Sequence, residues 1–204
     1  MIEDEILRKI TDLIPKRGLK RLLDIGCGDG RLTMILKDRL DIEEVYGVDK
    51  NEHAIERARK FGVKAFICDV DKDPLPFDCE FFDIVTMIRV IEHLINPDNA
   101  IKEAYRVTKP DGILIIVTPN QASYFNRILL LFGYPILGLD LSTKVRYKYP
   151  FGVTSTCSGH VRLYTFSSLK MLLQTYGFKV KKIQGLPSAF SKTEAKGLLK
   201  LVKA

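Results

Sequence analysis

The sequence predicts an α/β domain in which an open, mostly parallel sheet is covered by helices on both faces. From residue 20 onward, short apolar runs alternate with helical patterns, which is typical of repeated βαβ units. The apolar runs are continuous, as expected for strands buried on both faces. A chain of 204 residues fits one domain, and we expect residues 1–204 to form it.

Each predicted element follows from its local pattern. An acidic start leads into an amphipathic helical pattern, and residues 22–25 then form a buried first strand that ends in a glycine-rich turn. The later strands are apolar runs, and the helices between them are amphipathic. Strands are predicted at residues 45–48, 65–67, 82–88, 112–117 and 179–183, and helices at 30–39, 52–61, 97–107 and 166–176. Beyond them we expect only a weakly helical, lysine-rich segment.

The regular alternation stops after the fifth predicted strand, between residues 120 and 164. This inserted segment combines aromatic, apolar and basic residues without a clear period. Long irregular insertions in compact domains are usually functional or mobile. We therefore expect residues 120–164 to form a cap or lid over a binding site.

The composition limits the class of protein. A formal net charge of +7 alone would fit a nucleic-acid partner. Many of the lysines, however, lie in the last quarter of the chain, where a solvated basic face is more common, so nucleic acid is disfavoured as a partner.

The cysteines and the ends of the chain favour a cytoplasmic location. Cys27, Cys68, Cys79 and Cys157 lack the spacing of a zinc site or a disulfide framework. Free cysteines fit a reducing compartment, and the acidic start does not resemble an export signal. The longest apolar stretch, residues 128–141, is too short to cross a membrane.

The most informative segment follows the first strand and reads Asp24-Ile25-Gly26-Cys27-Gly28-Asp29-Gly30. A strand that enters a glycine turn and then a helix lets backbone N–H groups approach a polar ligand closely. The spacing is G-x-G-x-G followed by Arg31, whereas a dinucleotide site needs G-x-G-x-x-G and a P-loop ends in G-K-[ST]. The pattern therefore disfavours both of these site types.

This segment resembles the first motif of the class I S-adenosylmethionine-dependent methyltransferases. Further matching motifs follow in order: Tyr46-Gly47-Val48-Asp49, Cys68-Asp69-Val70, Phe82-Asp83-Ile84-Val85, Ile91-Glu92-His93-Leu94 and residues 103–112. They are similar to the small-molecule subgroup, methyltransferase type 11, which includes quinone-biosynthesis enzymes. The resemblance covers residues 20–120 closely and 160–184 loosely. It implies a Rossmann-like fold that ends in a strand hairpin, of which the last strand is either absent here or lies beyond the chain.

The resemblance also implies a site for S-adenosylmethionine, with S-adenosylhomocysteine as product. The glycine loop would line the methionine half, Asp49 would accept from both ribose hydroxyls, and Asp69 would accept from the adenine amino group. The cofactor-binding residues expected on this basis are Asp24, Gly26, Cys27, Gly28, Gly30, Asp49, Lys50, Asp69 and Val70. The alternative is a purely structural role, in which the glycines form a tight turn and Asp49 caps a helix.

Two histidines are candidates for the acceptor site. His93 follows the fourth strand, at the edge where ligands bind in open α/β sheets, and either acts as a general base or packs locally. The resemblance points to His160, near the end of the inserted segment, as an acceptor-site residue; otherwise it is a polar residue that leads into the next element.

The predicted reaction is metal-independent methyl transfer to a hydroxyl, carboxyl or activated carbon of a small, partly apolar molecule. No acidic pair follows the fourth strand to hold magnesium. Two alternatives remain: RNA methylation, suggested only by the charge, and a catalytically silent cofactor-binding module.

The inserted segment also has the composition of a membrane interface. Its largely apolar residues 124–141 are followed by Lys144, Arg146 and Lys148. The two interpretations are a packed cap with a solvated basic rim and a cap that touches the inner membrane face.

Overall fold

One seven-stranded sheet organises the computed structural model, which describes residues 2–15, 18–142, 144–152, 154–155, 158–188 and 191–203. Its strands lie in the order β3-β2-β1-β4-β5-β7-β6. The bounds are β1 Arg21–Ile25, β2 Glu44–Asp49, β3 Lys64–Ile67, β4 Phe82–Ile88, β5 Thr108–Pro119, β6 Phe178–Ser188 and β7 Ser191–Lys203. The first five strands pair in parallel, and β7 pairs antiparallel with β5 and β6. This arrangement confirms the predicted open, mostly parallel sheet.

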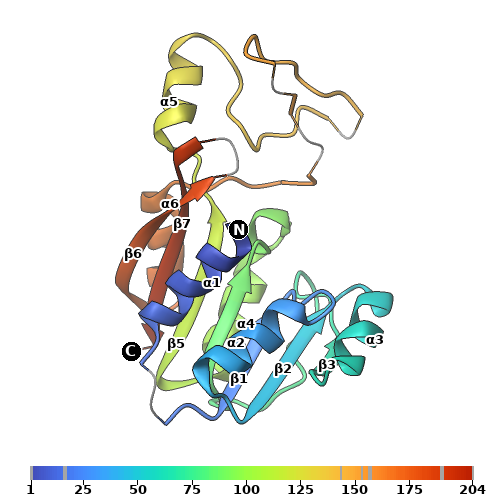
Figure 1. The fold of residues 1–204 in the computed structure, drawn as a ribbon. Coiled ribbons are helices and arrows are strands. Elements are labelled where there is room, and N and C mark those ends of the chain that lie inside the picture. Colours follow the sequence, from blue (N-terminus) through green and yellow to red (C-terminus); the bar gives the residue numbers. More distant parts are fainter. Residues whose placement is uncertain are drawn as a thin grey trace.

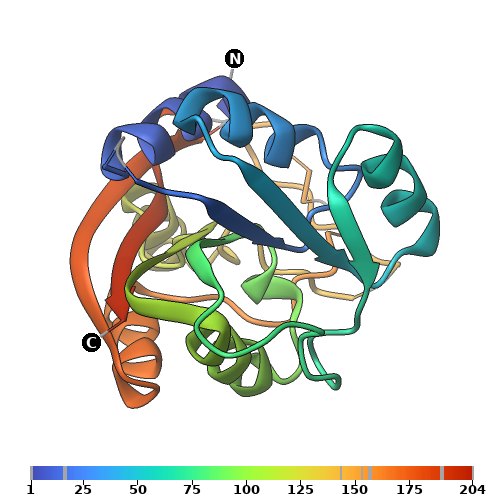
Figure 2. The ribbon, with the colours of Figure 1, turned by 90° about the horizontal axis from the view of Figure 1, so that it is seen from below.

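Helices cover both faces of the sheet, as predicted (Figure 2). Their bounds are α1 Ile2–Leu13, α2 Arg31–Leu40, α3 Glu52–Lys60, α4 Pro97–Val107, α5 Tyr124–Leu131 and α6 Phe166–Thr175, with a 3-10 turn η1 at Ile91–His93. One apolar cluster packs the sheet against α1, α2 and α3, and a second packs it against α4 and α6. Within β5, Ile115 joins the first cluster and its neighbours Leu114 and Ile116 join the second. Alternate residues of the continuous apolar run in β5 therefore pack into the apolar clusters on opposite faces of the sheet.

The end of the chain differs from the prediction. Residues 191–203 form β7 rather than a weakly helical segment, so the expectation that the last strand is absent or lies beyond the chain was wrong. β7 pairs with β5 from Ile113↔Val202 to Pro119↔Lys196 and with β6 on its other side. Helix-forming residues such as Leu, Lys and Ala dominate residues 195–203, and the hydrogen bonds offered by two neighbouring strands outweigh that local preference.

The inserted segment stands on the carboxyl edge of the sheet and contains α5 and long loops (Figure 1). The buried side chain of Asn126 joins its parts, because Oδ1 accepts from the Leu137 N–H (3.0 Å) and Nδ2 donates to the Gln121 carbonyl (3.1 Å). The Phe125 and Phe151 rings pack edge to face at 5.5 Å. No helix in the described ranges is both long and apolar enough to cross a membrane.

A buried carboxylate ties the centre of the sheet to α2. Asp24 on β1 is 3% exposed, and its two oxygens accept from the Thr33 hydroxyl (2.6 Å) and the Thr86 hydroxyl (2.7 Å). Burial raises the pKa of Asp24 to about 6, although both hydroxyl hydrogen bonds oppose the shift.

We expect this carboxyl group to make stability depend on pH. Its pKa in the folded protein lies above its unfolded value, so the contribution of Asp24 to stability is greatest below about pH 4 and is lost as pH rises through about 6. For a shift of about two units the loss is roughly 2–3 kcal/mol. Urea unfolding at a series of pH values should show this fall in the native protein and not in Asp24→Asn. Asp38→Asn, at an exposed site on α2, is the control; the same fall in Asp24→Asn would contradict the assignment.

Candidate functional site

A cavity of about 410 Å³ opens where β1, β2 and β4 end. Ladder pairing brings these ends together, because Ile25 of β1 lies opposite Val48 of β2 and Met87 of β4. Six of the predicted site residues line the cavity: Gly26, Asp49, Lys50, Asp69, Val70 and His93. The others, Asp24, Cys27, Gly28, Gly30 and His160, are not part of its lining.

Two glycines of the glycine loop, Gly26 and Gly30, allow close packing. Gly26 has φ +74°, its N–H donates to the Val48 carbonyl (2.8 Å), and a Cβ there would lie 2.3 Å from a methyl carbon of Val90. Gly30 begins α2 with φ +81°, and a Cβ there would lie 2.9 Å from a methyl carbon of Val63. Left-handed backbone and contacts this short exclude larger residues at both positions.

The side chain of Cys27 packs into the apolar cluster with α1, α2 and α3 and does not line the cavity. Its side chain is buried, and burial raises the pKa of its thiol, with the carboxylates of Asp24 and Asp49 adding to the effect. A buried, protonated thiol of this kind is unreactive. Cys157, the fourth cysteine of the sequence, lies outside the described residues.

Asp49 connects the glycine loop to the next helix. One carboxylate oxygen accepts from the Gly28 N–H (3.0 Å), and the other accepts from the Asn51 N–H (2.9 Å), just before α3. A carboxylate oxygen can accept more than one hydrogen bond. Both oxygens therefore keep acceptor capacity toward the cavity that Asp49 lines.

The loop after β3 forms another part of the cavity wall, and α4 holds it in place. Asn99 donates to the Val70 and Asp73 carbonyls, at 3.0 and 3.1 Å. Asp69 pairs with Lys72 at 3.0 Å, and the Lys72 ammonium is the main cause that lowers the pKa of the Asp69 carboxyl. Asp69 is thereby kept as a charged acceptor at the cavity rim.

Sequence reasoning missed a cation in the cavity lining. Arg89, just after β4, has φ +58°, and its N–H donates to the Val117 carbonyl (2.8 Å). A left-handed conformation at a residue other than glycine costs free energy and is found more often at functional sites. With Lys50 it gives the cavity two basic side chains. No sequence pattern marks Arg89, because its conformation arises from the loop that joins β4 to η1.

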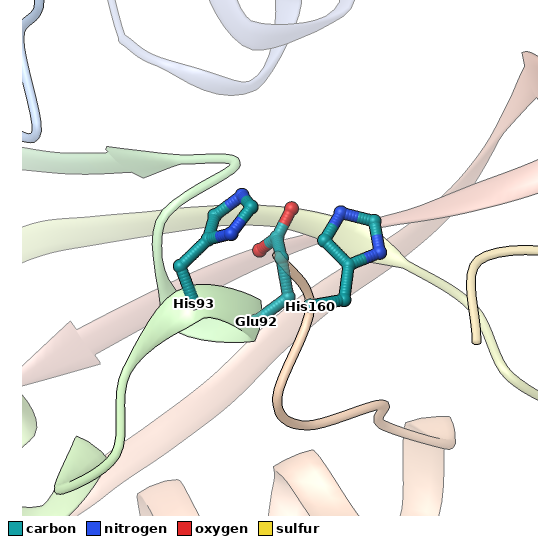
Figure 3. Close-up of side chains that lie close together, drawn as sticks. All are labelled: Glu92, His93 and His160. Carbon is teal, nitrogen blue, oxygen red and sulfur yellow. The ribbon is translucent and has the colours of Figure 1, made fainter. Parts of the chain in front are cut away.

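The two candidate histidines lie side by side in the structure (Figure 3). Their ring centroids are 4.9 Å apart. His93 comes from η1 and contacts the Gly159 carbonyl through Nδ1 (3.1 Å), whereas His160 contacts the Gly138 carbonyl through Nδ1 (2.9 Å). The sequence pointed to each histidine separately, and the returning end of the inserted segment brings them together.

The carboxylate of Glu92 lies close to both imidazoles, and Glu92 was not among the predicted site residues. It is 1% exposed, and its Oε2 accepts from the Thr118 hydroxyl (3.0 Å) at the end of β5. Burial raises the pKa of Glu92, while the hydrogen bond from its own N–H and that from Thr118 oppose the shift. Its backbone carbonyl accepts from the N–H groups of Val161 and Arg162, which fixes the inserted segment against η1.

Comparisons with known proteins agree with this geometry. A demethylmenaquinone methyltransferase of Thermus thermophilus is 31% identical over 145 residues, covering 64% of this chain and 66% of that protein. The mitochondrial ubiquinone biosynthesis O-methyltransferase of Bos taurus is 32% identical over 150 residues, covering 68% of this chain and 40% of that protein. The chain thus spans less than two thirds of the length of each.

Solved structures show the same fold. A SAM-dependent methyltransferase from Thermotoga maritima superposes with a TM-score of 0.71 at 24% identity, over 99% of this chain and 89% of that one. The family described as "Methyltransferase domain" matches residues 2–183. The chain belongs to this family of methyltransferases.

Proposed function

We propose that the chain transfers a methyl group from S-adenosylmethionine to a small-molecule acceptor. The observation that carries the proposal is the cavity at the carboxyl edge, where the glycine loop, Asp49 and Asp69 follow three different parallel strands. Family membership supplies the reaction class. The charge of the chain remains the only argument for RNA, and nothing in the site favours a silent binding module over an enzyme.

The residues present fit the cofactor. Asp49 offers two carboxylate oxygens toward the cavity, which suits the adjacent hydroxyls of a ribose. Asp69 also lines the cavity and offers an acceptor for an amino group, and Lys50 and Arg89 supply positive charge for a carboxylate. An elongated ligand with a diol, an amino group and a carboxylate is therefore matched at several points of the wall.

Methyl transfer requires mainly that the acceptor atom and the methyl group are aligned. S-adenosylmethionine supplies an electrophilic methyl group when bound, so the chain has to hold the acceptor atom in line with it. We propose that His93 and His160 act on the acceptor rather than on the cofactor. His93 lines the cavity, and His160, which comes from the inserted segment, lies next to His93 just outside the lining, so both are near the point where acceptor and cofactor would meet.

We propose that the inserted segment, residues 120–164, forms a wall of the acceptor site and that the acceptor is partly apolar. A further cavity of about 220 Å³ between β5 and α6 has a mainly apolar lining that includes Tyr164, Phe166 and Leu169. The Tyr164 hydroxyl is buried without a partner among the described residues and is available to a ligand. The relatives named for menaquinone and ubiquinone methylation act on quinone-type molecules, which supports an apolar acceptor here.

Peripheral membrane contact is part of the proposal, because such acceptors partition into lipid. Several side chains of α5 and its end are exposed and apolar, with Leu131 at 81% and Phe132 at 69%. Lys144, Arg146 and Lys148 are exposed in the same inserted segment. Apolar side chains beside basic ones suit an anionic membrane surface, and the cytoplasmic face is where we propose the chain works.

The cofactor assignment predicts that S-adenosylmethionine and S-adenosylhomocysteine bind with micromolar dissociation constants, whereas NAD does not bind measurably. Arg31 begins α2 at the position where a dinucleotide site needs glycine for close helix packing. Isothermal titration calorimetry measures all three ligands. Binding of NAD as tight as that of S-adenosylhomocysteine would reject the assignment.

Replacement of Asp49 tests the ribose contact. Asp49→Ala should weaken S-adenosylhomocysteine binding by about 1.5–3 kcal/mol, the scale for losing charged hydrogen bonds. It also leaves the Gly28 and Asn51 N–H groups without their acceptor, so thermal unfolding must show that the variant is folded at the assay temperature. Glu52→Gln, an exposed neighbour outside the cavity, is the control. Unchanged affinity in folded Asp49→Ala would leave Asp49 with only a structural role, that of connecting the glycine loop to Asn51, the N-cap of α3.

The membrane proposal predicts that the native protein floats with anionic liposomes and not with neutral ones. Changing Lys144, Arg146 and Lys148 to Glu should abolish flotation, since each basic residue near an anionic surface contributes about 1 kcal/mol. The matched control changes Lys179, Lys181 and Lys182 to Glu, an equal change of charge on the exposed side of β6. If both variants lose flotation equally, binding to anionic liposomes depends on the net charge of the protein and not on the surface formed by Lys144, Arg146 and Lys148.

A further inference from the structure

We propose that Glu92, His93 and His160 bind a divalent transition-metal ion, with zinc as the best-suited metal. Each residue offers one ligand atom, and these atoms lie within 4.8 Å of one another. Figure 3 shows the two imidazoles on either side of the carboxylate. In a tetrahedral zinc site with bonds of about 2 Å, ligand atoms lie roughly 3.4 Å apart. Small side-chain movements would therefore close the three groups around an ion.

The hydrogen bonds of the histidines prepare them to be ligands. A carbonyl oxygen can only accept, so the contacts to Gly159 and Gly138 place the proton of each imidazole on Nδ1. A neutral imidazole protonated there carries its lone pair on Nε2. Histidines that bind metals almost always donate their other ring N–H to a backbone carbonyl, a carboxylate or water. Both histidines show this arrangement.

Glu92 supplies the negative charge. Its carboxylate is buried, the Thr118 hydroxyl orients it, and no Lys or Arg pairs with it in the part of the chain that the structure describes. A buried carboxylate without a cation is costly. A metal ion held by two imidazoles would offset that cost, and two histidines with one glutamate form a known donor set for zinc.

Three protein ligands leave one position of a tetrahedral ion free. His93 and Gly159 line the cavity, so the free position lies beside it. There the ion would take the hydroxyl oxygen of the acceptor and lower its pKa, so that the proton passes to solvent water. The resulting oxygen anion would form the new O–CH3 bond as the S–CH3 bond of S-adenosylmethionine breaks and S-adenosylhomocysteine leaves. This last step rests on the proposed function, whereas metal binding itself does not. It also departs from the sequence-based expectation of a metal-independent site.

The test uses the whole protein, stripped of metal with a chelator and then titrated with Zn²⁺ and with Co²⁺. Native protein should bind about one equivalent of each. The Co²⁺ form should show visible absorption of a four-coordinate ion without a sulfur charge-transfer band. His160→Ala should lower the affinity for Zn²⁺ on the order of 100-fold, and Glu92→Gln should do so by a similar factor.

Two control variants isolate the site. His53→Ala removes an exposed histidine near Glu56 on α3, and Cys79→Ser removes an exposed thiol; both should bind metal as the native protein does. S-adenosylhomocysteine titration of the same samples reports the fold and the cofactor site independently. Metal affinity that is unchanged in a folded His160→Ala, or lost in either control, would overturn the metal site. Absence of cofactor binding with metal binding intact would overturn only the proposed function.

Discussion

Parallel pairing of β1 with β2 and β4 is the constraint on which the site depends. In a parallel pair all strands point the same way, so their carboxyl ends meet at one edge. The N–H groups of Gly26 and Cys27, just beyond β1, bond to the Val48 carbonyl at the end of β2 and continue the pairing into the loop. The loop is thus held close to Asp49, and the cavity forms between these strand ends and the segment after β3.

The inserted segment adds what the parallel sheet alone does not provide. It leaves β5, forms α5 and returns along η1, where the Glu92 carbonyl accepts two backbone hydrogen bonds. Farther along, the Gln121 N–H donates to the Tyr164 carbonyl, which fixes both ends of the insertion at the end of β5. The inserted segment thus has a base held by backbone hydrogen bonds and an outer part with exposed apolar side chains.

Asp24 and Glu92 are buried carboxyl groups without a Lys or Arg partner in the described part of the chain, and burying such groups costs free energy. Asp24 is compensated by two threonine hydroxyls, and Glu92 by one. Both lie where strand ends approach the cavity, Asp24 beneath the glycine loop and Glu92 beside the histidines. Buried groups with shifted pKa values are concentrated at functional sites, because there the ligand can supply the missing partner.

The sequence by itself determined the parallel part of the sheet, the helices between its strands and the part of the cavity wall formed by the glycine loop, Asp49 and Asp69. Apolar runs and glycine spacing are local properties, and the carboxyl edge follows from strand direction, so Gly26, Asp49 and Asp69 could be placed together in advance. Only the tertiary structure decided the fate of residues 191–203, where pairing with β5 and β6 overrides helix-forming composition. It alone also joined Glu92, His93 and His160, because the return path of an irregular segment depends on side-chain hydrogen bonds such as those of Asn126, which carry no periodic pattern.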